Sequence, residues 1–197
     1  MSIDKATYDF YQGQAPHYSL NPALGPSRHL DAFLDRLSPA AEILELGCGG
    51  GRDAAHMIER GFKIDATDGI PAMVRKANER HDLNARLMQF SELSAYAAYD
   101  AIWAHACLLH CPRAELPSVL TRIHTAIRPG GFHYASFKLG DGEGRDLLGR
   151  LHNFPTPEWL RETFFAAQFA VVAEDIFAGK ASDGTQRDWM ALTVTKS

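Results

Sequence analysis

Short apolar runs alternate with amphipathic segments along most of this chain. The runs are between five and nine residues long, the length of a buried or half-buried strand. They are rich in Ile, Leu, Val and aromatic residues, which favour strands over loops. We therefore predict strands over 41–46, 62–67, 86–90, 99–104, 132–137, 169–177 and 188–195.

The segments between these runs carry helix patterns and helix boundary residues. The clearest pattern is in 115–127, where apolar residues recur with a period of 3.6: Leu116, Val119, Leu120, Ile123 and Ile127. Capping and breaking residues mark the ends of the other helices, among them Asp4, Gly61, Pro71 and Thr156. We predict these helices over 4–15, 27–37, 53–60, 71–80 and 156–167.

A glycine loop joins the first predicted strand to the helix that begins at Asp53. The order of strand, glycine loop, helix and second strand is typical of a nucleoside-binding βαβ half. A dinucleotide fingerprint GxGxxG counted from Gly47 would need a glycine at position 52, where this chain has Arg52. The loop therefore departs from the pattern typical of dinucleotide sites.

Three carboxylates surround this loop and narrow the ligand. Glu45 ends the first strand, Asp53 opens the helix, and Asp68 ends the second strand. A diphosphate normally uses the positive N-terminal end of such a helix, where Asp53 already lies. A cationic nucleoside fits better, with its ribose hydroxyls on Asp68 and its positive group near the acids. S-adenosylmethionine has this chemistry.

Four segments resemble motifs of the class I S-adenosylmethionine-dependent methyltransferases. ILELGCGGGRD resembles their first motif and IDATDGIPAMVRKA their second, in which Asp68 is the ribose acid. YDAIWAHACLLHCP and IRPGGFHYASF resemble the fourth strand with its turn and the lead-in to the fifth strand. The resemblance covers residues 30–138 and extends more loosely to the tail.

The resemblance implies one doubly wound, Rossmann-like α/β domain over residues 1–197. Its seven-stranded, mostly parallel sheet would have the order 3-2-1-4-5-7-6, with the last strand antiparallel and helices on both faces. Residues 1–37 would form a helical cover, 38–138 the cofactor-binding core, and 139–197 a lid loop, a helix and a C-terminal hairpin. Contacts with the cofactor are expected from Tyr11, Glu45, Gly47, Cys48, Gly49, Gly51, Asp53, Asp68, Gly69, Ile70, Glu92, Leu93, Ala104 and His105.

Two of these expectations carry an open alternative. The family usually holds the adenine amino group with an Asp near Ser91 to Leu93, and that acid is not obvious here. Tyr8, Tyr11 and Tyr18 would lie in the cover, where an aromatic face favours a sulfonium. The alternative is that these tyrosines pack as amphipathic surface cover, the commoner role of aromatic pairs at helical spacing. Of them we predict Tyr11 at the cofactor and Tyr18 at the acceptor.

His105, Cys107, His110 and Cys111 mix imidazole and thiol groups and therefore suggest two kinds of site. A structural zinc site usually takes paired ligands from separate turns, whereas this segment runs from a strand into a turn. We predict no metal here. His105 and His110 are instead the candidate bases, if the acceptor must lose a proton near neutral pH.

The segment KLGDGEGRDLLGR follows the fifth predicted strand on the ligand side of the sheet. Its three glycines at 140, 142 and 144 predict a mobile loop. As a lid, it would place Lys138, Arg145 and Arg150 near an anionic group of the acceptor. The alternative is a solvated loop with internal ion pairs.

Composition excludes several classes of function. A net charge of −4 and a pI near 6.1 give no basic surface for nucleic acid. Neither an apolar leader nor a run of 18 apolar residues occurs, and the three cysteines favour reduced thiols, so we expect a cytoplasmic location.

We predict methyl transfer from S-adenosylmethionine to a small molecule, with S-adenosylhomocysteine as product. The sequence also resembles bacterial methyltransferases of thiol, tellurite and related acceptors, which leaves the acceptor open. One alternative is an NAD-dependent oxidoreductase on a related βαβ unit. Another is a protein that binds S-adenosylmethionine without catalysis, because methyl transfer requires no particular catalytic side chain.

Overall fold

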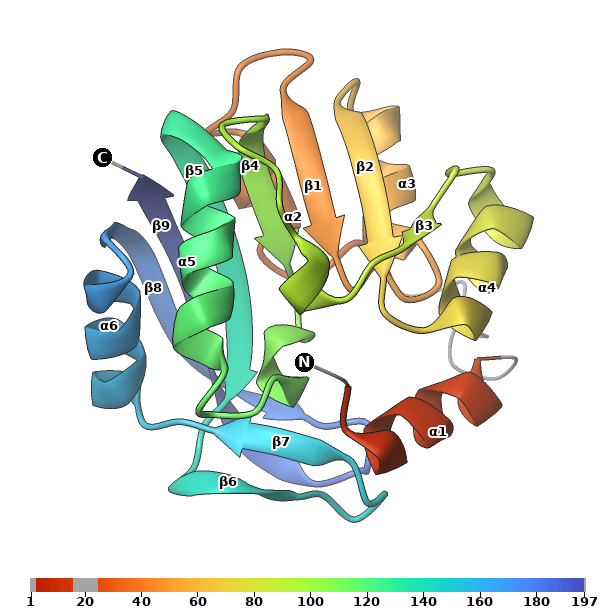
Figure 1. The fold of residues 1–197 in the computed structure, drawn as a ribbon, viewed down its shortest axis with the longest axis vertical. Coiled ribbons are helices and arrows are strands. Elements are labelled where there is room, and N and C mark those ends of the chain that lie inside the picture. Colours follow the sequence, from red (N-terminus) through yellow and green to blue (C-terminus); the bar gives the residue numbers. More distant parts are fainter. Residues whose placement is uncertain (1–2, 16–24, 197) are drawn as a thin grey trace.

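Seven strands form one sheet in the computed structural model, which describes residues 3–15 and 25–196. The order across the sheet is β3-β2-β1-β4-β5-β9-β8 (Figure 1). Adjacent strands are parallel except at β9, which runs antiparallel to both β5 and β8. Since β8 and β9 are the sixth and seventh strands of this sheet along the chain, the predicted order 3-2-1-4-5-7-6 is confirmed. The antiparallel last strand is confirmed as well. The strands are β1 (Glu42–Leu46), β2 (Lys63–Asp68), β3 (Arg86–Leu87), β4 (Tyr99–Ala104), β5 (Ile127–Lys138), β8 (Phe169–Lys180) and β9 (Gln186–Lys196).

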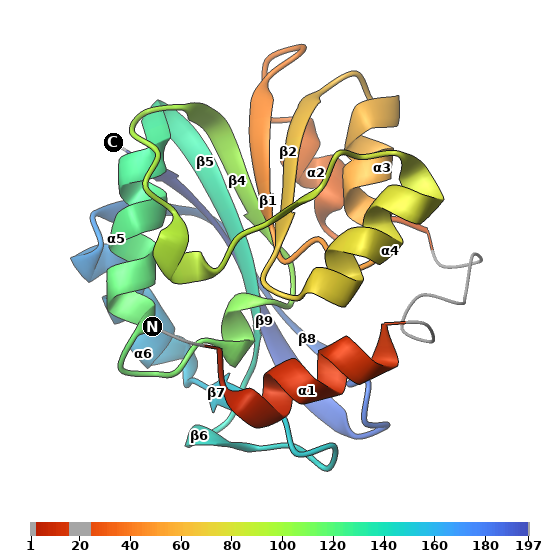
Figure 2. The ribbon, with the colours of Figure 1, turned by 45° about the vertical axis from the view of Figure 1, so that its right-hand side comes forward.

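Helices cover both faces of the sheet. One face packs against α2 (Leu30–Leu34), α3 (Arg52–Glu59) and α4 (Pro71–His81), and the other against α5 (Leu116–Ala126) and α6 (Pro157–Ala166). Figures 1 and 2 show α1 (Lys5–Gln14) at the edge where β1, β2 and β4 end. Two short 3₁₀ turns, η1 (Phe90–Glu92) and η2 (Leu108–His110), follow β3 and β4.

The predicted helix ends are formed by side chains and glycine as expected. Asp4 caps α1, where its Oδ1 accepts a hydrogen bond from the Thr7 N–H at 3.0 Å. Thr156 caps α6 in the same way. Gly61 follows α3 with φ of +89°, a conformation that glycine adopts without strain. These caps fix where the chain leaves each helix.

Some predicted boundaries differ from the structure. The helix expected over 27–37 is α-helical only at 30–34, and the third strand pairs with β2 for just two residues before η1 begins. β5 starts at Ile127, so Gly131 lies inside the strand. A Cβ on Gly131 would lie 2.5 Å from the Asp100 carbonyl oxygen, so its glycine permits the close approach of β4.

The segment expected to be a mobile glycine loop is an antiparallel hairpin, and that expectation is wrong. Its strands are β6 (Gly142–Arg145) and β7 (Leu151–Phe154). Gly140 also has a packing role, because a Cβ there would lie 2.7 Å from the Phe154 Cβ. Close packing against Phe154, rather than mobility, explains this glycine.

None of the helices in the described residues is long and apolar enough to span a membrane.

Candidate functional site

A cavity of about 1220 Å³ lies at the edge of the sheet where β1, β2 and β4 end. This is the edge at which open α/β sheets bind ligands. Its wall combines α1, the loops that follow these three strands, and the tip of the β6–β7 hairpin. The side chains that carry most of its polar chemistry are Tyr11, Glu45, Arg52, Asp53, Asp68, Gln89, Ser91, His105 and His110.

The glycine loop forms the floor of the cavity because its backbone makes close turns that side chains would obstruct. Gly47 has φ of +69°, and a Cβ on it would lie 2.5 Å from the Cys107 Cβ. Gly51 has φ of +81° at the N-terminus of α3, where a Cβ would meet Leu83 at 2.4 Å. Gly47 therefore lets the loop after β4 approach β1, and Gly51 lets α4 pack against α3.

Asp68 is held at the end of β2 by backbone groups. Its Oδ2 accepts from the Gly49 N–H and its Oδ1 from the Ile70 N–H, both at 2.9 Å. Burial raises the pKa of Asp68 to about 6, against the opposing effect of these N–H groups. Each carboxylate oxygen can accept more than one hydrogen bond. Asp68 therefore offers a fixed acceptor for hydroxyl groups of a ligand in the cavity.

Glu45 brings a second, incompletely bonded acid to the same wall. The Ala54 N–H binds its carboxyl group, yet Oε2 is buried without a hydrogen-bond partner among the described residues. Burial, followed by the nearby charges of Asp53 and Asp68, raises the pKa of Glu45 well above its usual value. A buried carboxyl oxygen without a partner is costly, so a donor from a bound ligand would stabilise it.

Asp53, the third acid of the loop, is bonded within the protein. Its Oδ1 accepts from the Ser27 N–H and from Arg52 Nε, each at 3.0 Å, and its Oδ2 accepts from Trp103 Nε1 at 3.1 Å. It still lines the cavity at the start of α3. Asp53 thus places a negative charge where a phosphate group would need a positive helix end.

The two candidate bases lie in different surroundings. His110 Nδ1 is 2.7 Å from the Leu151 carbonyl oxygen, and its Nε2 is 2.7 Å from the Tyr11 hydroxyl. His105 Nδ1 is 3.3 Å from Ser136 Oγ, and its Nε2 has no hydrogen bond among the described residues. Burial lowers the pKa of both imidazoles, that of His105 to about 4. Both rings are therefore neutral at pH 7.

The family profile described as "Methyltransferase domain" matches residues 43–131, which include the glycine loop, Asp68 and His105. The chain is 27% identical to the malonyl-[acyl-carrier protein] O-methyltransferase of Salmonella typhimurium over 85% of this chain and 62% of the relative. A structure of Burkholderia thailandensis 1,6-didemethyltoxoflavin-N1-methyltransferase, with 1,6-didemethyltoxoflavin and S-adenosylhomocysteine bound, superposes with a TM-score of 0.72. That structure shares 25% identity, with 98% of this chain and 84% of the other covered.

The chain is therefore similar in sequence to methyltransferases and has the fold of the S-adenosylmethionine-dependent methyltransferases. Its fold also matches the [4+2]-cyclase SpnF at a TM-score of 0.76 and 16% identity, over 100% of this chain and 97% of the other. The chain spans between 41% and 62% of the lengths of the first curated relatives that it matches.

The structure brings most of the predicted cofactor and catalytic residues of this chain to one cavity. They are Tyr11, Glu45, Gly47, Cys48, Gly49, Asp53, Asp68, Gly69, Ile70, His105 and His110. Four others do not line it: Gly51, Glu92, Leu93 and Ala104. Glu92 binds the Gln89 N–H at 2.7 Å within η1, while Leu93 and Ala104 are buried in the apolar core.

None of the three predicted acceptor cations lines the cavity. Lys138 is buried beneath the hairpin, and Arg145 forms an ion pair with Asp4 of α1. Arg150 is 1% exposed, and Asp146 of the same hairpin binds its guanidinium. Their predicted place beside the acceptor does not follow from this geometry, because Lys138 is buried at the end of β5 and the two hairpin arginines bind acidic side chains of the protein. Tyr18 lies outside the described residues.

The cavity wall also contains residues that were not among the predicted cofactor contacts. Gln89 and Ser91 precede and follow Phe90 next to the expected adenine position, where Glu92 and Leu93 were predicted instead. η1 begins at Phe90, so the chain has already turned away from the cavity at Glu92 and Leu93. The cysteine and histidine side chains after β4 have separate partners. Among the described residues, no three His, Cys, Asp or Glu groups are placed to hold a metal ion.

Proposed function

We propose that this domain transfers the methyl group of S-adenosylmethionine to a small-molecule acceptor. The observation that carries this proposal is the position of Asp68. Its carboxylate is fixed by the Gly49 and Ile70 N–H groups at the mouth of the glycine loop, facing the cavity. A carboxylate in this position can accept hydrogen bonds from the two ribose hydroxyls of the cofactor.

The other acids of the loop fit the positive end of the same cofactor. Glu45 Oε2 is a buried acceptor that lacks a donor among the described residues, and an ammonium group would supply one. Asp53, paired with Arg52, offsets the positive end of α3 that a diphosphate would use and tolerates a sulfonium or ammonium. These charges support S-adenosylmethionine over NAD.

The bound cofactor supplies an activated methyl group, so the protein mainly has to bind, align and exclude water. The described residues provide these functions from two sides. Asp68 and the glycine loop would fix the nucleoside, while Phe10 and Tyr11 of α1 close the cavity opposite the sheet. His105, which follows β4, lines the same cavity with a neutral imidazole, the form that can accept a proton.

The size of the cavity supports a small acceptor. Pockets for drug-sized ligands occupy about 300–1,000 Å³, so 1220 Å³ has room for a cofactor and a second small molecule. The relatives are named for acceptors as different as malonyl-[acyl-carrier protein] and 1,6-didemethyltoxoflavin. We therefore leave the nucleophile open among thiol, hydroxyl, amine and metalloid groups.

A binding protein without methyl transfer is the second candidate, because the cyclase SpnF has the same fold. Incubation with S-adenosylmethionine carrying a deuterated methyl group and a panel of acceptors separates the two. Mass spectrometry should find a product heavier by one labelled methyl group, together with S-adenosylhomocysteine. Binding of the cofactor without a labelled product from any acceptor class would favour the second candidate.

A further inference from the structure

The hydroxyl of Tyr11 belongs to a line of four hydrogen-bonded groups at one end of the cavity. Its oxygen lies 2.7 Å from His110 Nε2, and Arg150 Nη1 donates to it at 2.8 Å. His110 Nδ1 in turn lies 2.7 Å from the Leu151 carbonyl oxygen. Tyr11 and His110 both line the cavity, whereas the Arg150 side chain is buried in the hairpin beside them.

The two ends of this line determine every donor in it. A carbonyl oxygen only accepts, so His110 carries a proton on Nδ1. Burial lowers the pKa of His110 well below its usual value, so the ring is neutral at pH 7 and Nε2 has no proton. Nε2 therefore accepts, and the Tyr11 hydroxyl donates its only proton to it. Arg150 can only donate, so the Tyr11 oxygen accepts from Arg150.

The committed proton restricts what else Tyr11 can bind. Because this proton is donated to His110, any further group that bonds to the Tyr11 oxygen has to supply a hydrogen. A carbonyl, a carboxylate or another oxyanion would instead bring lone pairs against lone pairs, and its own oxygen would lose a partner on leaving water. Tyr11 therefore discriminates between ligands by the direction of a hydrogen bond.

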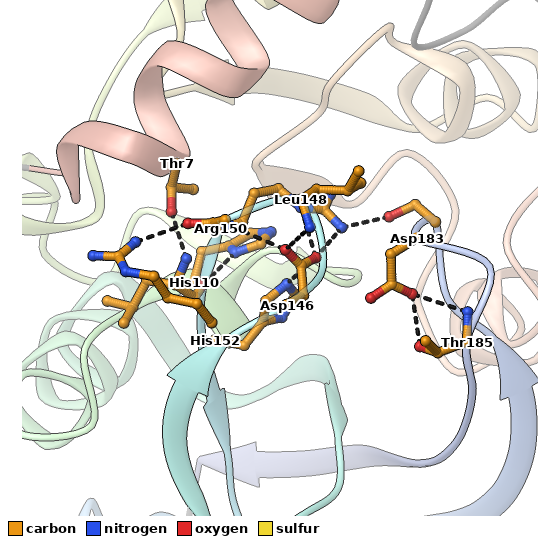
Figure 3. Close-up of polar contacts among 12 residues, drawn as sticks. Thr7, His110, Asp146, Leu148, Arg150, His152, Asp183 and Thr185 are labelled. Carbon is orange, nitrogen blue, oxygen red and sulfur yellow. Dashed lines mark hydrogen bonds and ion pairs between the residues drawn. The ribbon is translucent and has the colours of Figure 1, made fainter.

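Contacts between α1 and the hairpin hold this direction in place. Arg150 is 1% exposed, and Asp146 accepts from its Nε and Nη2 (Figure 3). The N–H group of Leu151 donates to Oγ1 of Thr7, one helical turn before Tyr11, at 2.8 Å. Both partners that set the direction, Arg150 and the Leu151 carbonyl, thus come from one fixed segment. A reversed hydroxyl at Tyr11 would require the hairpin to move.

The position of His110 in the fold separates this line from the proposed nucleoside site. Asp68 ends β2, His110 lies in η2 after β4, and β1 runs between these two strands. Neighbouring strands lie about 4.8 Å apart, so β2 and β4 are about 10 Å apart. A nucleoside held by Asp68 leaves the His110 end of the cavity to the methionine part of the cofactor and to the acceptor.

We propose that Tyr11 is a specificity-determining residue that selects an acceptor with an O–H or N–H group at this contact and disfavours carboxylates, oxyanions and tertiary amines. This inference rests on the proposed methyl transfer and narrows its acceptor to alcohols, phenols and amines that carry hydrogen. Arg150 acts on the ligand through the hydroxyl that it holds, and not as a direct partner for an anion.

Nitrogen-15 NMR of the full chain with labelled histidine tests the direction without any acceptor. Long-range proton–nitrogen correlations distinguish Nδ1–H from Nε2–H, and the His110 signals are assigned by their loss in His110→Gln. At pH 7 we expect a neutral His110 with its proton on Nδ1. A proton on Nε2, in either the neutral or the doubly protonated ring, would overturn the proposal, because Tyr11 would then have its own proton to donate.

Cyclohexanol and cyclohexanone are matched probes for the selection itself, because they are similar in size and only the alcohol can donate a hydrogen. Each is titrated by ligand-observed NMR into the wild type, with and without saturating S-adenosylhomocysteine. The alcohol should bind about fivefold to tenfold more tightly, as expected for one net hydrogen bond. Equal affinities, a preference for the ketone, or no binding of either probe would contradict the proposal.

Tyr11→Phe removes the hydroxyl and keeps the ring, so the ratio of the two affinities should approach one. Tyr8→Phe is the matched control, because Tyr8 lies on the same helix but outside the cavity wall. It should keep the wild-type ratio. An unchanged ratio in a folded Tyr11→Phe protein would remove Tyr11 from the contact. Should this variant fail to fold, the tautomer and the probe ratio of the wild type still decide the proposal.

Calorimetry with S-adenosylhomocysteine on the same samples separates this inference from the proposed function. The affinity of Tyr11→Phe should differ from that of the wild type by less than the roughly fivefold expected for one lost hydrogen bond. A larger loss with an unchanged probe ratio would assign the hydroxyl to the ammonium group of the cofactor and overturn the inference. Absence of binding to the wild type would contradict the proposed function, while the probe ratio measured without S-adenosylhomocysteine would still hold.

Discussion

The carboxylate of Asp68 is the most specific single contact proposed for the cofactor. Asp68→Ala should weaken the binding of S-adenosylhomocysteine about tenfold to a hundredfold, because hydrogen bonds to a charged group contribute about 1.5–3 kcal/mol. Isothermal titration calorimetry measures the change. Asp65→Ala is the matched control, since Asp65 lies in the same strand but binds Arg86 and Tyr99. A folded Asp68→Ala protein with wild-type affinity would remove this residue from the site.

The raised pKa of Asp68 predicts a pH dependence of the same binding. The ionised carboxylate accepts the ribose hydroxyls better than the protonated form, and burial raises its pKa to about 6. Affinity should therefore be constant above this pH and fall as the pH decreases through about 6, approaching tenfold per pH unit. Titrations between about pH 5 and 8, which bracket that pKa, measure the profile. In Asp68→Asn this decline should be lost, and a wild type without the decline would contradict the prediction.

At the residue scale, the sequence motifs predicted which residues reach the site, but the sequence did not predict which side chains are buried. Asp68 was predictable because a βαβ unit places the acid at the end of its second strand. The contact between Tyr11 and His110 was not, since these residues are 99 positions apart and meet only when α1 docks. Arg150 seemed suited to bind a ligand because a charged side chain in a glycine-rich segment suggests exposure. Its burial with Asp146 depends on how the hairpin packs.

At the scale of elements, α1 and the β6–β7 hairpin form one cover over the cavity. Arg145 binds Asp4 through two bonds of 3.0 and 2.9 Å, and Thr7 Oγ1 accepts from the Leu151 N–H at 2.8 Å. Arg150 Nη1 donates to the Tyr11 hydroxyl at 2.8 Å. The connection between the two elements is largely polar, so it should loosen before the core does.

Arg145→Ala tests how far the outer ion pair holds the cover. Exposed ion pairs contribute little to stability, so hydrogen exchange in residues 5–14 should accelerate by up to about fivefold. Lys5→Ala is the control, because it removes a pair with Asp9 within α1 and leaves the hairpin untouched. Exchange by mass spectrometry follows both. Equal exchange in Arg145→Ala and Lys5→Ala would show that the hairpin does not hold α1.

The buried ion pair of Asp146 with Arg150 predicts a larger effect on stability than the exposed pair of Arg145 with Asp4. Figure 3 shows Asp146 between Arg150 and His152, and all three side chains are 1% exposed. Asp146→Ala leaves the guanidinium buried without its anion, which typically costs about 3–5 kcal/mol. For a chain of this size, the melting temperature should fall by about 2–4 °C for each kcal/mol. Calorimetric or circular-dichroism melts measure it.

Asp141→Ala serves as the control for this prediction, because Asp141 is an exposed acid of the same segment. The pKa of Asp146 is lowered to about 2, despite its burial, mainly by hydrogen bonds from Arg150. Its contribution to stability should thus be present above the pKa of an unfolded aspartate and be lost as the pH falls towards about 2. Similar melting temperatures for Asp146→Ala and Asp141→Ala would mean that the buried pair contributes little.

Elements were predictable where a periodic pattern was long. The strand order followed from the family resemblance and α5 from its apolar period, and the structure confirms both. The hairpin was missed because β6 contains two glycines and two charged residues, none of which favours a strand. Its pairing with β7 and the contact of Gly140 with Phe154 stabilise it through tertiary structure, which no local pattern records.

For the whole molecule, the fold determines where a ligand binds, but it does not determine which acceptor the protein uses. Parallel strands end at one edge of the sheet, so the motifs alone predict that the glycine loop, Asp68 and His105 meet there, as they do. The acceptor depends on side chains from α1, η1 and the hairpin, which come together only in three dimensions. The positions of Phe10, Gln89 and Leu148 in the cavity wall illustrate this dependence.

Binding of S-adenosylmethionine in this cavity is the claim on which the other proposals depend, and side-by-side calorimetry on the wild type tests it. S-adenosylhomocysteine and NAD are titrated separately into the same protein at about pH 7.5, where Asp68 is ionised because its pKa is about 6. We predict saturable binding of one S-adenosylhomocysteine per chain and no measurable heat of binding from NAD. Saturable binding of NAD without any response to S-adenosylhomocysteine would contradict this claim.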